Sequence, residues 1–149
     1  MRALQNHEFK QRGRNEGTKS MRDTLLLIGR ILLIAIFILS GLGKVFDLAG
    51  TAAYIGSKGL PLPTVLAPLV AIAELGLGLA VAIGFQTRLA AYALAAFSLL
   101  TIPFFHDFWN MAGEARMLNQ VQALKNIAMV GAFLILAAVG PGRYSVDRA

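Results

Sequence analysis

Four long apolar runs constrain this chain more than any other feature. They extend over about residues 24–42, 64–85, 89–105 and 121–139, and polar or turn-forming residues separate them. An α-helix rises about 1.5 Å per residue, so each run has the length needed to cross a hydrocarbon core about 30 Å thick. The sequence therefore predicts an all-α, integral membrane four-helix bundle whose surroundings are the lipid bilayer.

The composition supports the same class of protein. The 149 residues are 56% hydrophobic and 15% charged, whereas about a quarter of the residues in a soluble domain are charged. No cleavage site with small residues follows the first run, so we interpret it as a span and not as a signal peptide. We expect one membrane domain over residues 23–149.

Residues 1–22 precede this domain and differ from it. They are polar and basic, and they contain too few bulky apolar side chains to bury a core. The sequence predicts a disordered cytoplasmic tail, with either Met1 or Met21 as the native start.

Basic residues are distributed unevenly over the flanks of the four runs. If the N-terminus lies inside, nine Lys and Arg flank the runs on the cytoplasmic side, six of them in the tail. Only Lys44, Lys58 and Arg116 then lie outside. The positive-inside rule predicts an N-in/C-in orientation, and it also explains the net charge of +6 without a nucleic-acid partner.

The residue types that usually carry chemistry are scarce. The chain has no cysteine, and its two histidines are His7 and His106, so we predict no thiolate, haem or zinc site within one chain. No nucleophile stands at a recognisable spacing from a base, and no catalytic residue is predicted. Redox chemistry would have to come from a partner or a bound cofactor.

Charged and amide side chains inside the runs are the main candidate site residues. Glu74 lies near the middle of the second run, Arg30 lies in the first, and Lys125 and Asn126 lie in the fourth. A charge at the centre of a membrane helix costs about 2.5–3.5 kcal/mol, so such residues mark sites inside the bundle. We predict a polar pocket in which Glu74 pairs with Arg30, with Lys125 as the competing partner. Alternatively, the pair only sets helix register.

Helical phase predicts which faces turn inward. On the first span one face carries Arg30, Phe37, Gly41 and Lys44. On the second span small residues share a face with Glu74, namely Ala67, Ala71, Gly78 and Ala82. We expect Gly41, Gly76 and Gly78 to allow close helix packing.

Two further candidates lie at the ends of the runs. Lys44 either joins the polar pocket or extends its ammonium group to the membrane surface. His106 either hydrogen-bonds a quinone or another carbonyl ligand, or is an ordinary polar residue of the interface. The predicted ligand-binding set is therefore Arg30, Lys44, Glu74, His106, Lys125 and Asn126.

Short motifs over residues 25–148 together resemble the DoxX family of small membrane proteins. They are Arg30 with Phe37, Ser40-Gly41 and Lys44; Gly59-Leu60-Pro61; Glu74 with Gly76 and Gly78; Gly84-Phe85-Gln86-Thr87-Arg88; Phe105-His106; Lys125-Asn126; and Gly140-Pro141-Gly142-Arg143-Tyr144-Ser145-Val146-Asp147. The resemblance implies a four-helix, multi-pass protein of the bacterial inner (plasma) membrane.

The same resemblance implies a link to quinone-dependent redox. DoxX is similar to the DoxD subunit associated with quinone-linked thiosulfate oxidation, and relatives have been linked to membrane redox complexes and oxidative-stress responses. We therefore expect a non-catalytic, accessory subunit that binds a quinone or small organic ligand, beside a redox-enzyme partner or as a homo-oligomer. The alternatives are small-solute or proton transport through the buried charges, and a structural membrane anchor for a partner protein.

Overall fold

The computed structural model describes the backbone of residues 2–147 and the side chains of residues 16–147, and this part of the chain contains no strand. Its elements are α1 (Arg2–Phe46), α2 (Leu48–Ser57), α3 (Pro63–Ile83), α4 (Thr87–Phe105), the 3₁₀-helix η1 (Phe108–Asn110) and α5 (Gly113–Val139). Four segments are long and apolar enough to cross a membrane: Glu16–Phe46, Pro63–Ile83, Thr87–Asn110 and Gly113–Val139. The predicted all-α fold with four spans is confirmed.

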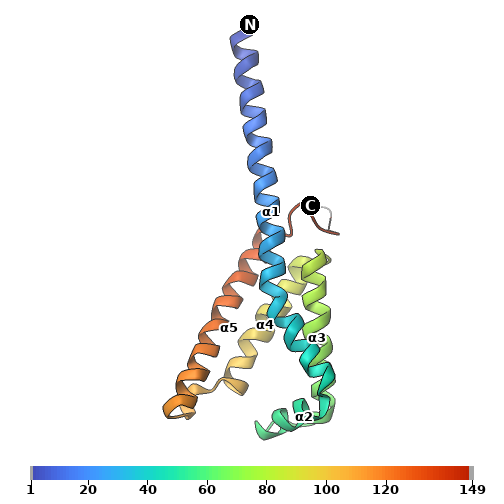
Figure 1. Ribbon diagram of the computed structural model, residues 1–149, viewed down its shortest axis with the longest axis vertical. Coiled ribbons are helices and arrows are strands. Elements are labelled where there is room, and N and C mark those ends of the chain that lie inside the picture. Colours follow the sequence, from blue (N-terminus) through green and yellow to red (C-terminus); the bar gives the residue numbers. More distant parts are fainter. Residues whose placement is uncertain (1, 148–149) are drawn as a thin grey trace.

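The first helix is longer than the first apolar run. It begins at Arg2 and ends at Phe46, so it passes through the tail that the sequence predicts to be disordered (Figure 1). No proline interrupts residues 2–46, and a helix that is already nucleated in the span can propagate through such a segment. The cytoplasmic location of this tail stays a prediction.

Two other boundaries also differ from those expected. The connection after the first span contains α2, which is capped by the Asp47 side chain accepting from the Gly50 N–H at 2.8 Å. Its Ile55 is buried, and the helix packs against α3. The last helix begins at Gly113, eight residues before the apolar run. The negative charge of Glu114 in its first turn is favourable at the positive end of the helix dipole.

The spans are arranged as two helix pairs. α1 packs along α3, and α4 packs along α5, while α2 lies against α3. The two pairs converge near the C-terminus and diverge toward the opposite end, which holds α2 and η1 (Figure 1). We call these the terminal end and the α2 end of the bundle.

An apolar core joins the two pairs where they converge. Phe37 of α1 stands edge-on to Phe133 of α5, with ring centroids 5.5 Å apart, and to Phe97 of α4 at 6.4 Å. The other buried core residues are Ile34, Val81, Ala90, Ala91, Leu94, Ala95, Leu136 and Ala137. Many of them are small, which lets helix backbones approach closely in a membrane.

The predicted inward faces are confirmed on both spans except at Lys44 and Ala82, which are only half-buried. Arg30, Phe37 and Gly41 are buried on α1. On α3 the buried residues are Ala67, Ala71, Glu74, Gly78 and Val81.

Candidate functional site

The centre of the candidate site is an ion pair between α1 and α3. The Lys44 ammonium donates to both carboxylate oxygens of Glu74, at 3.0 and 2.9 Å, and also to the Ser40 hydroxyl one turn earlier on α1. Glu74 is 5% exposed, and the Lys44 side chain is 25% exposed. Because this ion pair is largely buried, dissolved salt screens its attraction far less than that of a surface pair.

Close packing of α1 on α3 brings these two residues together. Gly41 lies against Leu75 and the Ala71 carbonyl, and Gly78 lies against Phe37 and Ile38. The two helices are therefore antiparallel: toward the terminal end, residue numbers fall along α1 and rise along α3. In this register Lys44 lies level with Glu74.

The predicted pairing of Glu74 with Arg30 is wrong. Arg30 is fourteen positions before Lys44, which is about 21 Å along a helix. It lies instead beside the end of α3, where it donates to the Val81 carbonyl at 3.5 Å. The ends of the apolar runs do not set the register of the two helices, because α1 continues beyond its run at both ends.

Gly76 also differs from its predicted role in helix packing. A Cβ atom at this position would have open space around it, whereas Gly41 and Gly78 face neighbouring side chains. The residue lies on α3 outside the buried face that carries Glu74.

The Lys44–Glu74 pair lies on the wall of a cavity of about 290 Å³ between the two helix pairs. Its polar lining residues are Ser40, Lys44, Thr51, Tyr54, Glu74, Ser98, Thr101, His106, Gln122 and Asn126. Its apolar lining residues are Ile36, Phe37, Ile55, Val70, Phe97, Phe105 and Met129. Every helix except η1 contributes, because the cavity occupies the space into which the pairs diverge.

Asn126 and a short ladder of hydroxyl groups form the wall opposite the ion pair. The Asn126 amide donates to the Thr101 hydroxyl at 3.0 Å, and Thr101 donates to the Ser98 carbonyl at 2.8 Å. Ser98 in turn donates to the Leu94 carbonyl at 2.8 Å. These bonds hold polar atoms on the cavity wall of α4 and α5, where lipid could not satisfy them.

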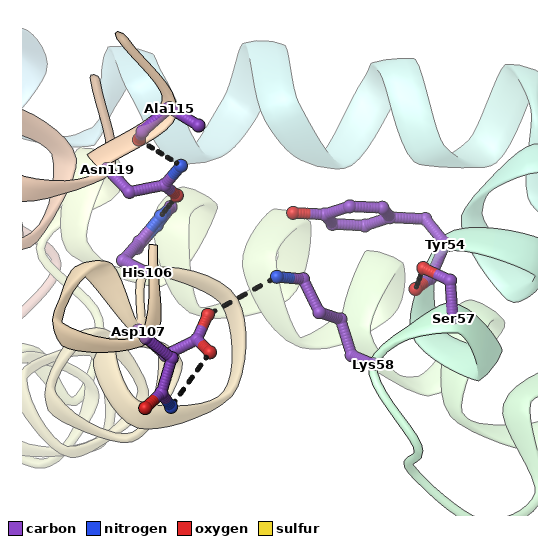
Figure 2. Close-up of polar contacts among 8 residues, drawn as sticks. Tyr54, Ser57, Lys58, His106, Asp107, Ala115 and Asn119 are labelled. Carbon is purple, nitrogen blue, oxygen red and sulfur yellow. Dashed lines mark hydrogen bonds and ion pairs between the residues drawn. The ribbon is translucent and has the colours of Figure 1, made fainter. Parts of the chain in front are cut away.

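His106 lines the cavity where it approaches the α2 end. It is the residue just after α4, and its Nδ1 lies 3.4 Å from the side-chain oxygen of Asn119 on α5 (Figure 2). The Asn119 amide donates to the Ala115 carbonyl at 3.0 Å, which fixes the orientation of this partner. The imidazole is therefore positioned by α5 beside the cavity.

Lys125 does not belong to this site. Its side chain is exposed and is not part of the cavity lining, whereas the next residue, Asn126, is buried. One residue along a helix is a rotation of about 100°, so the two neighbours point to different sides of α5. The predicted competition of Lys125 for Glu74 is thus contradicted.

A second polar cluster holds the C-terminal segment on the terminal end of the bundle. Arg30 is 1% exposed and donates to the Tyr144 carbonyl as well as to Val81. Asp147 accepts from the backbone N–H groups of Gln86 and Thr87, at 2.8 and 2.7 Å, and from the Thr87 hydroxyl at 2.9 Å. Its carboxylate therefore caps the N-terminus of α4.

The electrostatics of this cap follow from its geometry. The backbone N–H of Thr87 is the largest of the causes that lower the pKa of Asp147, and the Gln86 N–H and the Arg30 charge act in the same direction. Gly84 permits the arrangement, because it ends α3 with a φ of 73° and has Arg30 and Ser145 packed against it.

Sequence reasoning assigns no site role to residues 145–147 and Thr87, although the motifs at 84–88 and 140–147 both belong to the family resemblance. In the structure these two motifs bind one another, through Val146 N–H to the Ile83 carbonyl and Asp147 N–H to the Gly84 carbonyl. The hydroxyls of Ser98 and Thr101 were also missed. Their spacing of three residues on one helix face is the signal that would have indicated a polar wall.

Of the six predicted ligand-binding residues, the cavity brings together Lys44, Glu74, His106 and Asn126, and it leaves out Arg30 and Lys125. Within the described residues no group of three or more His, Cys, Asp and Glu could hold a metal ion.

Comparisons with known proteins identify relatives of this chain. The DoxX family profile matches residues 25–107. The Inner membrane protein YqjF of Escherichia coli is 41% identical over 130 residues, which cover 87% of this chain and 95% of that protein. The Inner membrane protein YphA of the same organism is 38% identical over 127 residues, covering 85% and 91%. No solved structure gives a significant match. With its four spans, the chain therefore belongs to the DoxX family and is a multi-pass protein of the bacterial inner membrane.

Proposed function

We propose that this protein is a non-catalytic binding subunit that holds the polar head group of a lipid-soluble small molecule, such as a quinone, in the cavity between its two helix pairs. One observation carries the proposal: a buried Lys44–Glu74 ion pair borders a cavity of about 290 Å³ inside the membrane-spanning region. A buried pair that only sets register needs no cavity beside it.

The lining chemistry suits a ring that bears oxygen atoms. Lys44 and Asn126 supply N–H donors, and Glu74 supplies acceptors, on opposite walls of the cavity. Aromatic and aliphatic side chains fill the remaining wall, as in most small-molecule sites. The volume is near the lower end of the roughly 300–1,000 Å³ range of ligand pockets. It fits one head group better than a large cofactor.

The accessory role rests on what the chain does not supply. It has no cysteine, so it has no thiol that could exchange electrons with a substrate. A bound quinone would therefore pass its electrons to or from a partner oxidoreductase. The resemblance of DoxX to a subunit of quinone-linked oxidation is consistent with this assignment.

The separation of the buried charges supports binding in preference to conduction. Lys44 and Glu74 lie toward the α2 end, whereas Arg30 and Asp147 lie at the terminal end. The apolar core around Phe37 and Phe133 lies between the two clusters. A proton path through this core would have to cross a layer without polar groups, so we expect liposomes containing the protein to show no Glu74-dependent proton flux.

Photo-labelling tests the proposal directly. A photoreactive benzoquinone with a decyl chain is added to the protein in lipid nanodiscs, and labelled residues are located by mass spectrometry. We expect saturable labelling of the cavity lining, reduced at least about fivefold in Glu74→Gln because the acceptor pair and its hold on Lys44 are weakened.

The matched control is Lys125→Gln, which removes a charge at a similar depth but away from the cavity. It should label like the wild type. Equal labelling of Glu74→Gln and wild type would refute the proposal. If Glu74→Gln lowers only the thermal stability, the anchor alternative would replace it.

A further inference from the structure

The cavity reaches the surface of the molecule on one side. Three of its lining residues are substantially exposed: Ile36 of α1 (45%), Tyr54 of α2 (51%) and Gln122 of α5. Ile36 and Gln122 come from the two helices on either side of the space between α1 and α5, whereas Tyr54 lies at the α2 end, beside Phe105. These two spans meet at the Phe37–Phe133 ring contact and diverge from there toward the α2 end (Figure 1).

This opening lies at the depth of the hydrocarbon core. Ile36 lies well inside the span Glu16–Phe46, and its neighbours Leu32 and Leu39 on α1 are each 71% exposed. On α5 the exposed residues nearby include the apolar Val121 and Leu124, and Lys125 is exposed beside them. In a bilayer such surfaces contact acyl chains, so the mouth of the cavity opens to lipid.

The α2 end of the cavity, by contrast, is bridged. Lys58, the residue just after α2, reaches Asp107, just before η1, with 3.4 Å between Nζ and Oδ1 (Figure 2). Next to this bridge the Tyr54 and Phe105 rings lie 5.6 Å apart. Together these contacts tie the end of α2 to the end of α4 beside the cavity.

The charges around the cavity restrict the head group that it can take. Lys44 is already neutralised by Glu74, and Lys58 by Asp107. A phosphate or carboxylate in the cavity would thus meet no unpaired counter-charge, and burying it would be costly. A neutral head with carbonyl or hydroxyl oxygens can accept from Lys44 and donate to or bridge Glu74 without disturbing this balance.

The cavity has both polar and apolar walls, as a ligand with a polar head and an apolar tail would require. The ion pair and Asn126 lie on its inner walls, and Ile36 and Met129 border it on α1 and α5. We infer that the ligand is a neutral, oxygen-bearing head group on a long apolar tail, which enters sideways from the bilayer between α1 and α5 and leaves its tail there. This inference rests on the proposed function and specifies its ligand class and its route of entry.

Two variants close the two routes separately. Ile36→Trp narrows the lipid-facing mouth, and its matched control is Ile31→Trp, since Ile31 is 46% exposed on the same helix but is not part of the lining. Lys58→Cys with Asp107→Cys, joined by a short bismaleimide, locks the α2 end. The natural chain has no cysteine, so this cross-link is the only one formed.

The measurement is the rate of saturable labelling by the decyl benzoquinone probe in proteoliposomes, with a tail-less dimethoxy-methyl benzoquinone as competitor. We expect Ile36→Trp to slow labelling at least about fivefold relative to Ile31→Trp, the cross-link to leave it unchanged, and the tail-less compound to compete weakly. Gln122→Trp, on the opposite side of the mouth, repeats the test if Ile36→Trp does not fold.

Other outcomes would overturn the inference in distinguishable ways. If the cross-link abolishes labelling while Ile36→Trp labels like Ile31→Trp, the ligand enters from water and only this inference fails. If the tail-less compound competes as well as the decyl form, the tail is not part of recognition. If the wild type shows no saturable labelling, the proposed function and this inference fail together.

Discussion

At the scale of single residues, the ion pair of Lys44 and Glu74 is the most consequential contact in the bundle. Each partner is the only described charge that the other contacts within salt-bridge distance. Removing one of them leaves the second charge in a poorly hydrated site, whereas removing both leaves none. The effects of the two single substitutions on stability should therefore not be additive, which distinguishes this pair from an exposed one.

We expect Lys44→Met and Glu74→Gln each to lower the free energy of unfolding by about 2–3 kcal/mol, slightly less than for a fully buried pair because Lys44 is partly exposed. The free energy of unfolding of the double variant should fall by clearly less than the sum of the two single decreases. Unfolding by denaturing detergent, followed by circular dichroism, measures all four proteins.

The matched control is the Lys58–Asp107 pair, whose carboxylate is more exposed than that of Glu74, so Lys58→Met and Asp107→Asn should each change stability less than the variants of the buried pair. Strict additivity at Lys44 and Glu74 would show that the two side chains are not coupled in the membrane.

At the scale of secondary-structure elements, the N-terminus of α4 depends on a residue sixty positions away. Gln86 begins the turn into α4 with a φ of 46° and provides no side-chain cap. Asp147 supplies the missing acceptor, and the C-terminal segment is thereby held on the bundle. Loss of the Asp147 side chain should therefore destabilise both the N-terminus of α4 and the C-terminal segment.

This coupling predicts a dependence on pH. The N–H groups of Thr87 and Gln86 lower the pKa of Asp147 in the folded protein. A carboxyl group with a lowered folded pKa contributes stability that is complete above its unfolded pKa of about 3.9 and is lost as the pH falls through the folded value. Asp147→Asn should be less stable than the wild type at neutral pH, and the difference between their thermal midpoints should shrink below about pH 4.

Glu16→Gln, which changes an exposed carboxylate on α1, serves as the control and should follow the wild type at every pH. A gap between wild type and Asp147→Asn that stays constant down to pH 2 would contradict the capping interaction.

At the scale of the whole molecule, two helix pairs meet in an apolar core and diverge around a polar cavity. Both ends of this arrangement are closed by polar contacts, through Arg30 and Asp147 at one end and through Lys58 and Asp107 at the other. The side between α1 and α5 has no such closure among the described residues. This difference between the ends and the side is the basis of the proposed exchange of ligand with lipid.

The N-in/C-in orientation is a prediction at this scale. Nine basic residues flank the spans on the terminal side against three on the α2 side, so the terminal end should lie in the cytoplasm. In spheroplasts, a membrane-impermeant maleimide should label Ser57→Cys on α2 but not Arg143→Cys in the C-terminal segment. Both positions are exposed, and the natural chain has no cysteine to interfere. Labelling of Arg143→Cys alone would reverse the orientation.

The amino-acid sequence by itself determined the number of spans and the faces that turn inward. Both depend on local properties: the length of an apolar run, and a period of about 3.6 residues, which together placed Glu74, Gly78 and Phe37 inside the bundle. The candidate residues Lys44, Glu74, His106 and Asn126 followed from the rarity of polar groups in lipid.

Only the tertiary structure decided which of these residues meet. Partner choice depends on the axial shift between two helices, and this shift is set by close contacts such as Gly41 on Leu75 and Gly78 on Ile38. A shift of a few turns exchanges Arg30 for Lys44 as the partner of Glu74 without changing any local pattern. The cavity arises in the same way, because it is a gap between helix pairs that no single helix encodes.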